Sequence, residues 1–319
     1  MKTKVELVEG SIGPNGIPLL TYLCTYPRII HAEMMTHKML NKNASSNRAI
    51  PGMKQLENTQ ANTFTPSVFQ KLHKGMQGSE AFEGEELEKV QDWWRRSAIN
   101  AVISAGEGIE LGVTKQLTNR WLETPGYITV VITGTEWANF FGLRCHQDAE
   151  IHIQELAYQM KDLYLHAKIG GGLTQLEEGQ WHLPFVTAEE KSTLDIEVQK
   201  KLSVARCAWT SYKTPEGKIP SLERALKIYD QLYTSQPMHA SPFEHQGQAL
   251  PKFFYNEMEY HESHSELSIG EIPKGVELRV KSNLDMELWS SNFRGWIQFR
   301  KTLDHECINN IPEEGIVYP

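Results

Sequence analysis

Apolar positions recur at helical spacing through much of the chain. The clearest case runs from Glu85 to Leu111, where apolar side chains every three or four residues leave charged side chains on the opposite face. Gly112 is expected to end this helix, because glycine adopts the left-handed conformation common at helix ends. Four further helices are expected over residues 114–123, 136–165, 187–205 and 221–234.

β-Branched residues mark the extended segments. Residues 128–133 are isoleucine, valine and threonine throughout, which predicts a strand or a stiff buried segment. Residues 18–30 are expected to form a strand that Pro27 interrupts, followed by a short helix. The polar stretch 51–83 is expected to be an excursion or a flexible insert. The mixture of strands and helices indicates an α/β (α+β) fold.

Composition and charge limit the classes of protein to which the chain can belong. An apolar content of 40% with 23% charged residues is ordinary for a globular protein, and 319 residues can bury a large core. The formal net charge of −8 argues against a general nucleic-acid binder, which needs a basic face. Apolar runs are too short to cross a bilayer and no signal peptide is expected, so a cytoplasmic location with reduced cysteines is predicted.

Residues 36–48 combine an imidazole, lysines, small polar side chains and an arginine with little apolar bulk. Such a segment offers hydrogen-bond donors at close intervals, which suits an anion or the edge of a heteroaromatic ring. Arg48 can hold a phosphate as a planar fork, and Ser45 and Ser46 can donate hydroxyl groups beside it. A capped turn that opens a helix is the alternative, because serine and asparagine favour N-cap positions.

The same segment resembles the signature of the flavin-dependent thymidylate synthases, R-H-R-x-x-S-x-N-x-x-S-x-R. His37, Asn43, Ser46 and Arg48 match this signature, Lys38 keeps the charge of an arginine, and Thr36 and Asn41 depart from it. Three other segments resemble family motifs: H-A-S-P-F-E-H at 239–245, N-F-F-G-L-R at 139–144 with D-A-E at 148–150, and A-W-T-S-Y at 208–212.

The matched segments follow a rearranged order. In the family the A-R-V-S-Y and S-P-F-E-H segments come before the signature, whereas here they follow it. The resemblance covers roughly 20–60, 85–160 and 200–250, and it implies a circularly permuted or rearranged member of the kind found in bacteriophages, acting in the host cytoplasm. Permutation is tolerable because domain termini often lie close together at the surface.

The resemblance also implies how the chain is organised. One part, 1–170, carries the signature, the L-R helix and the 51–83 insert. The other part, 171–319, carries the S-P-F-E-H segment and a C-terminal extension. Together they are expected to form one catalytic unit, built like the family on a mixed sheet with packed helices.

An enzyme that converts dUMP to dTMP is implied by the resemblance. In the family, methylenetetrahydrofolate provides a one-carbon unit at C5 of dUMP, reduced FAD delivers a hydride to it, and NADPH reduces the flavin. The protein contributes positioning and electrostatics. A homotetramer with active sites at subunit junctions is implied as well. Two alternatives are a related modification of another pyrimidine nucleotide, such as dCMP methylation or hydroxymethylation, and a catalytically silent nucleotide-binding homologue.

Arg144 matches the family arginine that holds the uracil edge and favours negative charge on the ring. Phe140 and Leu143 are expected to anchor its helix, and an ion pair with Asp148 one turn along is the alternative role for this arginine. The catalytic residues that the resemblance implies are Arg144, Ser46 and His245. The implied substrate-binding residues are Arg48, Ser46, Arg144, Arg120 and Glu33, for the last of which a solvated helix carboxylate is the alternative.

Flavin contacts are implied for a second group of residues. The segment that begins at Ser241 is also interpretable as a helix start, with Ser241 as the cap and Pro242 in the first position. The implied cofactor-binding residues are His37, Lys38, Asn43, Asn139, Ser211, Glu244 and His245.

Two departures from the family pattern bear on the substrate. A phosphate-binding arginine is expected near 119, where Asn119 stands, so a shift of one residue is needed for Arg120 to serve. Glu150 replaces a glutamine near the pyrimidine, and a carboxylate accepts hydrogen bonds only, which favours an amino group over a keto oxygen. No metal site is expected, because His146, Glu150 and His152 do not share one helical face.

Overall fold

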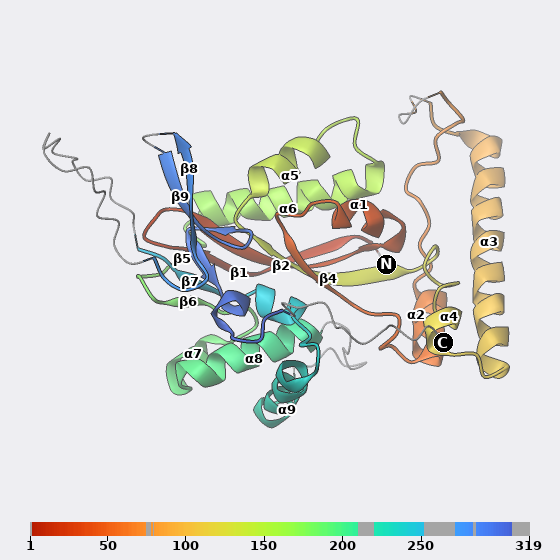
Figure 1. Cartoon of the computed structure of the whole chain (residues 1–319). Coiled ribbons are helices and arrows are strands. Elements are labelled where there is room, and N and C mark those ends of the chain that lie inside the picture. Colours follow the sequence, from red (N-terminus) through yellow and green to blue (C-terminus); the bar gives the residue numbers. More distant parts are fainter. Residues whose placement is uncertain are drawn as a thin grey trace, which may run out of the picture.

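A five-stranded sheet forms the centre of the computed structural model, which describes residues 2–74, 78, 80–209, 220–251, 272–282 and 285–307 (Figure 1). Its strands are β1 (Lys4–Ile12), β2 (Pro18–Pro27), β3 (Asn41–Ala44), β4 (Tyr127–Gly134) and β5 (Thr174–Gln175). They lie in the order β3-β4-β2-β1-β5, and β5 pairs parallel with β1 while the other pairs are antiparallel. The predicted α/β class with a mixed sheet is confirmed.

The central strands β2 and β4 are almost wholly buried, which explains their near-continuous apolar sequence. β4 contains residues 128–133, so the strand predicted there is confirmed. Pro27 does not interrupt β2 but ends it, opposite Tyr127 of β4. The predicted short helix follows as η1 (Arg28–Ile30) and α1 (His31–Met35).

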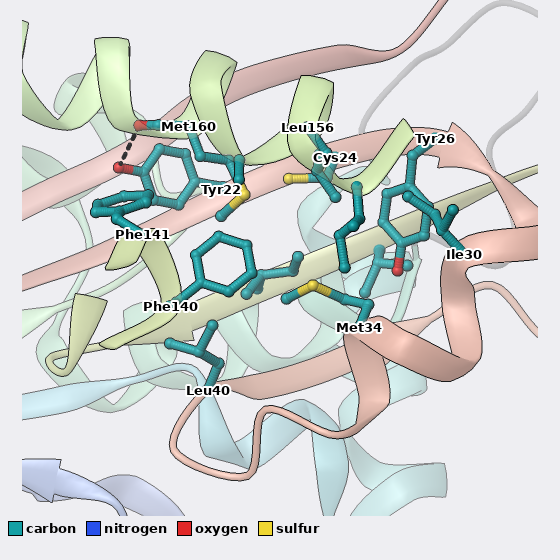
Figure 2. Packing of buried hydrophobic residues seen from close by; sticks show 14 of the residues in the cluster. Tyr22, Cys24, Tyr26, Ile30, Met34, Leu40, Phe140, Phe141, Leu156 and Met160 are labelled. Carbon is teal, nitrogen blue, oxygen red and sulfur yellow. Dashed lines mark hydrogen bonds between the residues drawn. The ribbon is translucent and has the colours of Figure 1, made fainter. Parts of the chain in front are cut away.

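Two helices, α5 (Trp137–Arg144) and α6 (Ile151–Ile169), cover one face of the sheet (Figure 1). Their apolar side chains form the main core with the sheet and α1, and Figure 2 shows Phe140 and Met160 packed around Tyr22. The Tyr22 hydroxyl donates a hydrogen bond of 3.3 Å to the backbone oxygen of Met160. The single helix predicted over 136–165 is wrong, because Glu150 caps a new helix start by accepting from two backbone N–H groups of α6.

At one end of the molecule lie α2 (Gly52–Ala61), α3 (Gly84–Glu110) and α4 (Lys115–Thr118) (Figure 1). α3 confirms the predicted long helix, but only Ala98 and Ala105 of its residues are buried. α2 falls in the polar stretch 51–83, which therefore contains a helix that its composition did not predict. The helix predicted over 114–123 is shortened to α4.

The opposite side of the sheet carries α7 (Ala188–Thr193), α8 (Ile196–Ala208) and α9 (Leu222–Thr234) (Figure 1). The helix predicted over 221–234 is confirmed. The one predicted over 187–205 consists of two helices, because Asp195 accepts hydrogen bonds from the backbone N–H groups of Glu197 and Val198 and so caps a second start. A second core joins these helices to the segments that follow; it includes Leu202, Ala205, Tyr229, Phe243 and Phe299.

Short elements connect the second core to the main sheet. One small sheet has the order β11-β7-β6, from β6 (Trp181–His182), β7 (Gly247–Ala249) and β11 (Trp296–Gln298). Another has the order β10-β9-β8, from β8 (Glu277–Ser282), β9 (Asp285–Ser290) and β10 (Phe293–Arg294). The 3-10 turns η3 (Ser241–Glu244) and η4 (Phe299–Thr302) lie beside them, and η3 leads directly into β7.

A chain of five fully buried polar side chains links the main sheet to the small β6–β7 sheet. Ser11 Oγ lies 2.8 Å from Nδ1 of His182, whose Nε2 lies 2.8 Å from Oγ1 of Thr21. Thr21 Oγ1 contacts Thr133 Oγ1 at 2.8 Å, and Thr133 Oγ1 contacts Nδ1 of His245 at 2.8 Å. Because a buried polar group is costly without a partner, this chain fixes how η3 and β7 lie against β2 and β4.

Replacing Thr133 by valine is expected to lower the free energy of unfolding by about 2–4 kcal/mol, because Thr21 and His245 then lose a buried partner. A matched control is Thr129→Val on the same strand, where the pair with Thr25 at 2.9 Å is only partly buried, and a loss of about 1 kcal/mol or less is expected. Urea unfolding of both variants measures the difference. Equal losses would mean that the buried chain stabilises the fold no more than a partly buried threonine pair does.

Candidate functional site

The signature and the S-P-F-E-H segment meet at strand β3. Asn41 Nδ2 donates to the backbone oxygen of Glu244 at 2.8 Å, so the strand holds the end of η3. Asn43 Nδ2 donates to the backbone oxygen of Cys207 at 2.8 Å, and its Oδ1 accepts from the Ser241 hydroxyl at 2.9 Å. The prediction that Ser241 caps a helix is therefore wrong, because its hydroxyl is used between segments. β3 thus joins the signature to segments about 160–200 residues further along the chain.

Arg144 lies at the end of α5, where the L-R segment meets the signature. Its Nε donates to Nε2 of His37 at 2.8 Å, and Nη1 forms an ion pair with Glu33 at 3.1 Å. The Arg144 side chain is 20% exposed, and within the described part of the chain its Nη2 has no hydrogen-bond partner. The alternative pairing of Arg144 with Asp148 is wrong. The arginine is thus held on one side and open on the other, which suits a group that orients a ligand.

α5 positions Arg144 through aromatic residues. Trp137, Phe140 and Phe141 are buried, and the Trp137 indole N–H donates to the backbone oxygen of Gly134 at 2.8 Å. Phe140 anchors the helix as predicted, but the same prediction for Leu143 is wrong, since Leu143 is 55% exposed. Phe141 anchors the helix instead and packs against α6. Trp137, Phe140 and Phe141 are spaced three and four residues apart and so share one face of the helix, from which Leu143 is turned away.

His37 is neutral at pH 7 and has one defined tautomer. Burial, reinforced by the charges of Arg144 and Lys42, lowers the pKa of His37 to about 4. Because Nε2 accepts the hydrogen bond from Arg144, the single ring proton lies on Nδ1. No other described side chain pairs with Nδ1, so the imidazole presents an N–H donor beside the arginine.

Three cations of the signature have no carboxylate partner among the described residues. Lys38 and Arg48 are exposed, and Lys42 is half-buried on β3. None of the three forms an ion pair with any carboxylate in the described ranges. The Ser46 hydroxyl accepts the backbone N–H of Arg48 at 3.2 Å, so it shapes the turn that carries this arginine. Lys42 occupies an unspecified position of the signature, and for that reason the sequence alone did not single it out.

The remaining cofactor candidates differ in accessibility. Asn139 is exposed on α5, whereas His245 is fully buried and contacts Thr133. The carboxylate of Glu244 forms an ion pair of 2.5 Å with Arg300. Burial raises the pKa of Glu244, and the pairing with Arg300 offsets only part of this effect. Ser211 lies outside the described residues.

Asn119 has a structural role. It is fully buried, and its Nδ2 donates to the backbone oxygens of Asn47 at 2.9 Å and Ile50 at 3.0 Å. It therefore holds the loop around Arg48 and cannot itself bind a phosphate. Arg120 is exposed and paired with Glu123 at 2.8 Å, so its substrate-binding role stays a prediction.

Glu150 is committed to its own helix. Its Oε2 accepts from the backbone N–H groups of His152 and Ile153 at 2.8 and 3.1 Å, and its Oε1 lies 2.6 Å from Nδ1 of His152. Burial acts to raise the pKa of Glu150, but these hydrogen bonds outweigh it and the pKa is lowered. Glu150 therefore has a local capping role, and its place near a pyrimidine stays a prediction.

The described residues form neither a metal-binding cluster nor a membrane-spanning helix. In the part of the chain that is described, no group of three or more histidine, cysteine, aspartate or glutamate side chains is arranged to hold a metal ion. Among the same residues, no helix combines the length and apolar character needed to span a bilayer.

No protein-family model matches the chain, and no curated protein matches it either. Solved structures do match the chain. A crystal structure of the UMP/dUMP methylase PolB from Streptomyces cacaoi with 5-Br UMP has 16% identity and a TM-score of 0.45, covering 51% of this chain and 89% of that one. The same methylase with 5-Br dUMP gives 15% identity and a TM-score of 0.43, over 51% and 90%. At this level the likeness concerns the backbone path of half the chain and carries no inference about ligand or activity.

Proposed function

We propose that the chain is a flavin-dependent enzyme that methylates a pyrimidine deoxynucleotide at C5, converting dUMP to dTMP. The observation that carries this proposal is the convergence of the matched segments on the signature. Arg144 of the L-R segment forms one hydrogen-bonded cluster with Glu33 and His37, more than 100 residues earlier in the chain. The S-P-F-E-H segment is tied to strand β3 of the signature through Asn41 and Asn43.

The unpaired cations fit an anionic nucleotide and an anionic cofactor. Lys38, Lys42 and Arg48 would hold the phosphate groups of FAD or of the substrate, because each lacks a carboxylate partner in the described part of the chain. When bound, a reduced flavin supplies the hydride that completes the methyl group. Methylenetetrahydrofolate and NADPH are the expected co-substrates.

The chain's own residues supply orientation and charge. Glu33 and His37 fix two nitrogens of Arg144, so the remaining Nη2 points where a pyrimidine oxygen would be held. Negative charge that develops on the ring would be stabilised there by a preorganised cation. The Nδ1–H group of His37 is a second donor beside it.

The cysteines support a route without a thiol nucleophile. Burial raises the pKa of Cys24, Cys145 and Cys207, so these thiols are protonated and poorly nucleophilic at neutral pH. The fourth, Cys307, is exposed after η4. A mechanism that builds the methyl group without covalent attachment to cysteine agrees with this distribution.

A second candidate is modification of dCMP, which the carboxylate of Glu33 favours. Glu33 is 40% exposed beside Arg144. Its Oε1 has no hydrogen-bond partner among the described residues and can accept a hydrogen bond from an amino group but not from a keto oxygen.

The test is mass spectrometry of nucleotides after incubation with FAD, NADPH, methylenetetrahydrofolate and equal amounts of dUMP and dCMP. Formation of dTMP is the expected result. A modified dCMP, or a hydroxymethylated product, would assign the second candidate. Absence of any product, with flavin nevertheless bound, would leave a nucleotide-binding homologue without activity.

A further inference from the structure

We propose that Lys42 is a binding residue for a phosphoryl anion in the candidate site. The ligand is the phosphate of the nucleotide or the diphosphate of the flavin, and this identity rests on the proposed function. The signature leaves position 42 unspecified, so the assignment comes from the surroundings of this side chain alone.

The fold sets Lys42 apart from its neighbours on β3. Asn41 and Asn43 hold η3 and the end of α8 through their side chains. The Lys42 side chain instead lies against the turn before β3, where its ammonium donates to the backbone oxygen of His37. The N–H of Leu40 donates to the same oxygen at 3.2 Å, which closes the turn between α1 and β3. This hydrogen bond therefore holds the ammonium beside His37 instead of letting it extend into solvent.

Among the described residues, the charges around Lys42 leave it without a counter-ion. Lys38 repels it, while Glu244 attracts it from η3 but is already paired with Arg300 at 2.5 Å. His37 is neutral and contributes no negative charge. Burial, reinforced by Lys38, lowers the pKa of Lys42 to about 8. A half-buried ammonium held by one neutral oxygen is costly, and an anion bound beside it removes this cost.

Phosphoryl chemistry fits this position better than a carboxylate. Lys38, Lys42 and Arg144 are three cations near His37, and Glu33 is the one carboxylate that pairs with any of them in the described ranges. A dianion matches the excess positive charge, and lysine binds phosphate well as a point charge. The excess stands out on a chain whose formal net charge is −8, so it raises the local concentration of anions at this site.

The experiment measures dissociation constants by calorimetry for two ligand pairs and one simple anion. The pairs are dUMP with deoxyuridine and FAD with riboflavin, and the anion is inorganic pyrophosphate. The variants are Lys42→Met, Lys42→Arg and Lys42→Gln, with Lys89→Met as the matched control on the exposed face of α3. Melting temperatures without ligand verify that each variant is folded.

The expected result is that Lys42→Met raises the dissociation constants of one phosphorylated ligand and of pyrophosphate about tenfold, while those of deoxyuridine and riboflavin stay unchanged. Lys42→Arg retains most of the affinity and Lys89→Met all of it. If dUMP is the ligand whose affinity falls, Lys42 binds the nucleotide phosphate. If FAD is that ligand, Lys42 binds the flavin diphosphate. Without ligand, Lys42→Met melts no lower than the wild type, since it removes a half-buried charge without a counter-ion.

Other outcomes separate this proposal from the proposed function. If the wild type binds neither dUMP nor FAD, yet pyrophosphate binds and Lys42→Met weakens it, the anion site stands and the proposed function fails. If Lys42→Met and Lys42→Gln bind every phosphorylated ligand and pyrophosphate like the wild type, the assignment of Lys42 is overturned. The same holds if pyrophosphate does not bind the wild type at all.

Discussion

We expect Arg144→Ala to lower kcat/KM for nucleotide methylation by about 100- to 1,000-fold, because a positioned hydrogen-bond donor to the reacting ring is lost. The kcat/KM of Arg144→Lys is expected to lie between the values of the wild type and of Arg144→Ala. Lysine keeps the charge but loses the planar fork that contacts Glu33 and His37 together. Steady-state kinetics with dUMP measures both effects. Stability should change by about 1 kcal/mol or less, because the ion pair with Glu33 is partly exposed.

Arg96→Ala is the matched control for this experiment. Arg96 is an exposed arginine on α3 that pairs with Asp92 one turn away, so its removal should leave kcat/KM unchanged. A folded Arg144→Ala protein with wild-type kcat/KM would exclude Arg144 from contact with the substrate. The structural cluster with Glu33 and His37 would then serve only to fasten α5 to α1.

Acidification from pH 6.5 to 5 is expected to lower the free energy of unfolding by on the order of 2–4 kcal/mol. Burial lowers the pKa of His245 to about 3 and that of His182 well below its usual value, so both stay neutral in the folded chain. The unfolded chain takes up protons at these residues as the pH falls through about 6.5. Stability is thus fully present above that pH and is lost below it, by about 2 kcal/mol per histidine at pH 5.

Other groups modify this loss. His31 and His37, each with a pKa lowered to about 4, also stay mostly neutral in the folded chain at pH 5 and add to the loss. Glu9 and Glu244 act in the opposite direction, since burial raises the pKa of both carboxyls and the folded chain then binds protons first.

Urea unfolding at pH 8, 6.5 and 5 measures the effect. His182→Gln serves as the control, because glutamine keeps polar atoms in the buried chain but does not titrate. This variant is less stable at every pH, yet its loss between pH 6.5 and 5 should be smaller by about 2 kcal/mol. A stability that is flat over this range in the wild type would contradict the assignment of the two histidines as buried neutral groups.

The elements that the sequence predicted correctly are those whose pattern is long or extreme. The β-branched run 128–133 is β4, and the long amphipathic pattern from Glu85 is α3. Helix breaks were missed at 145–150 and at 194–195, because Glu150 and Asp195 cap new starts through local hydrogen bonds that periodicity does not reveal. The strand β1 was also missed, since its polar residues obscure the alternation that pairs it with β2.

In the candidate site, too, some residues were identified from sequence motifs and others only from the fold. Sequence motifs identified Glu33, His37 and Arg144, which lie in one cluster although their roles stay predictions. They did not identify Lys42, because its importance comes from the turn that folds it back onto His37. Nor could they show that Asn119 holds the Asn47–Ile50 loop, since that contact joins positions about 70 residues apart.

The buried chain from Ser11 to His245 has two directions of hydrogen bonding that use both threonine hydroxyl protons, and a buried hydroxyl proton without an acceptor is costly. Each threonine hydroxyl has one proton, so if Thr133 donates to Thr21, then His245 must donate from Nδ1 and Thr21 must donate to Nε2 of His182. His182 then donates from Nδ1 to Ser11. Reversing one bond reverses all four, and both histidines move their proton to Nε2 together.

The two directions differ in energy at one end of the chain. Nε2 of His245 is buried with no partner among the described residues, and a bare acceptor there is less costly than an orphaned N–H. Both histidines therefore carry their proton on Nδ1. The tautomers of His182 on β6 and His245 after η3 are therefore correlated. A single substitution such as Thr133→Val uncouples them, and ¹⁵N chemical shifts of the two imidazoles would measure the change.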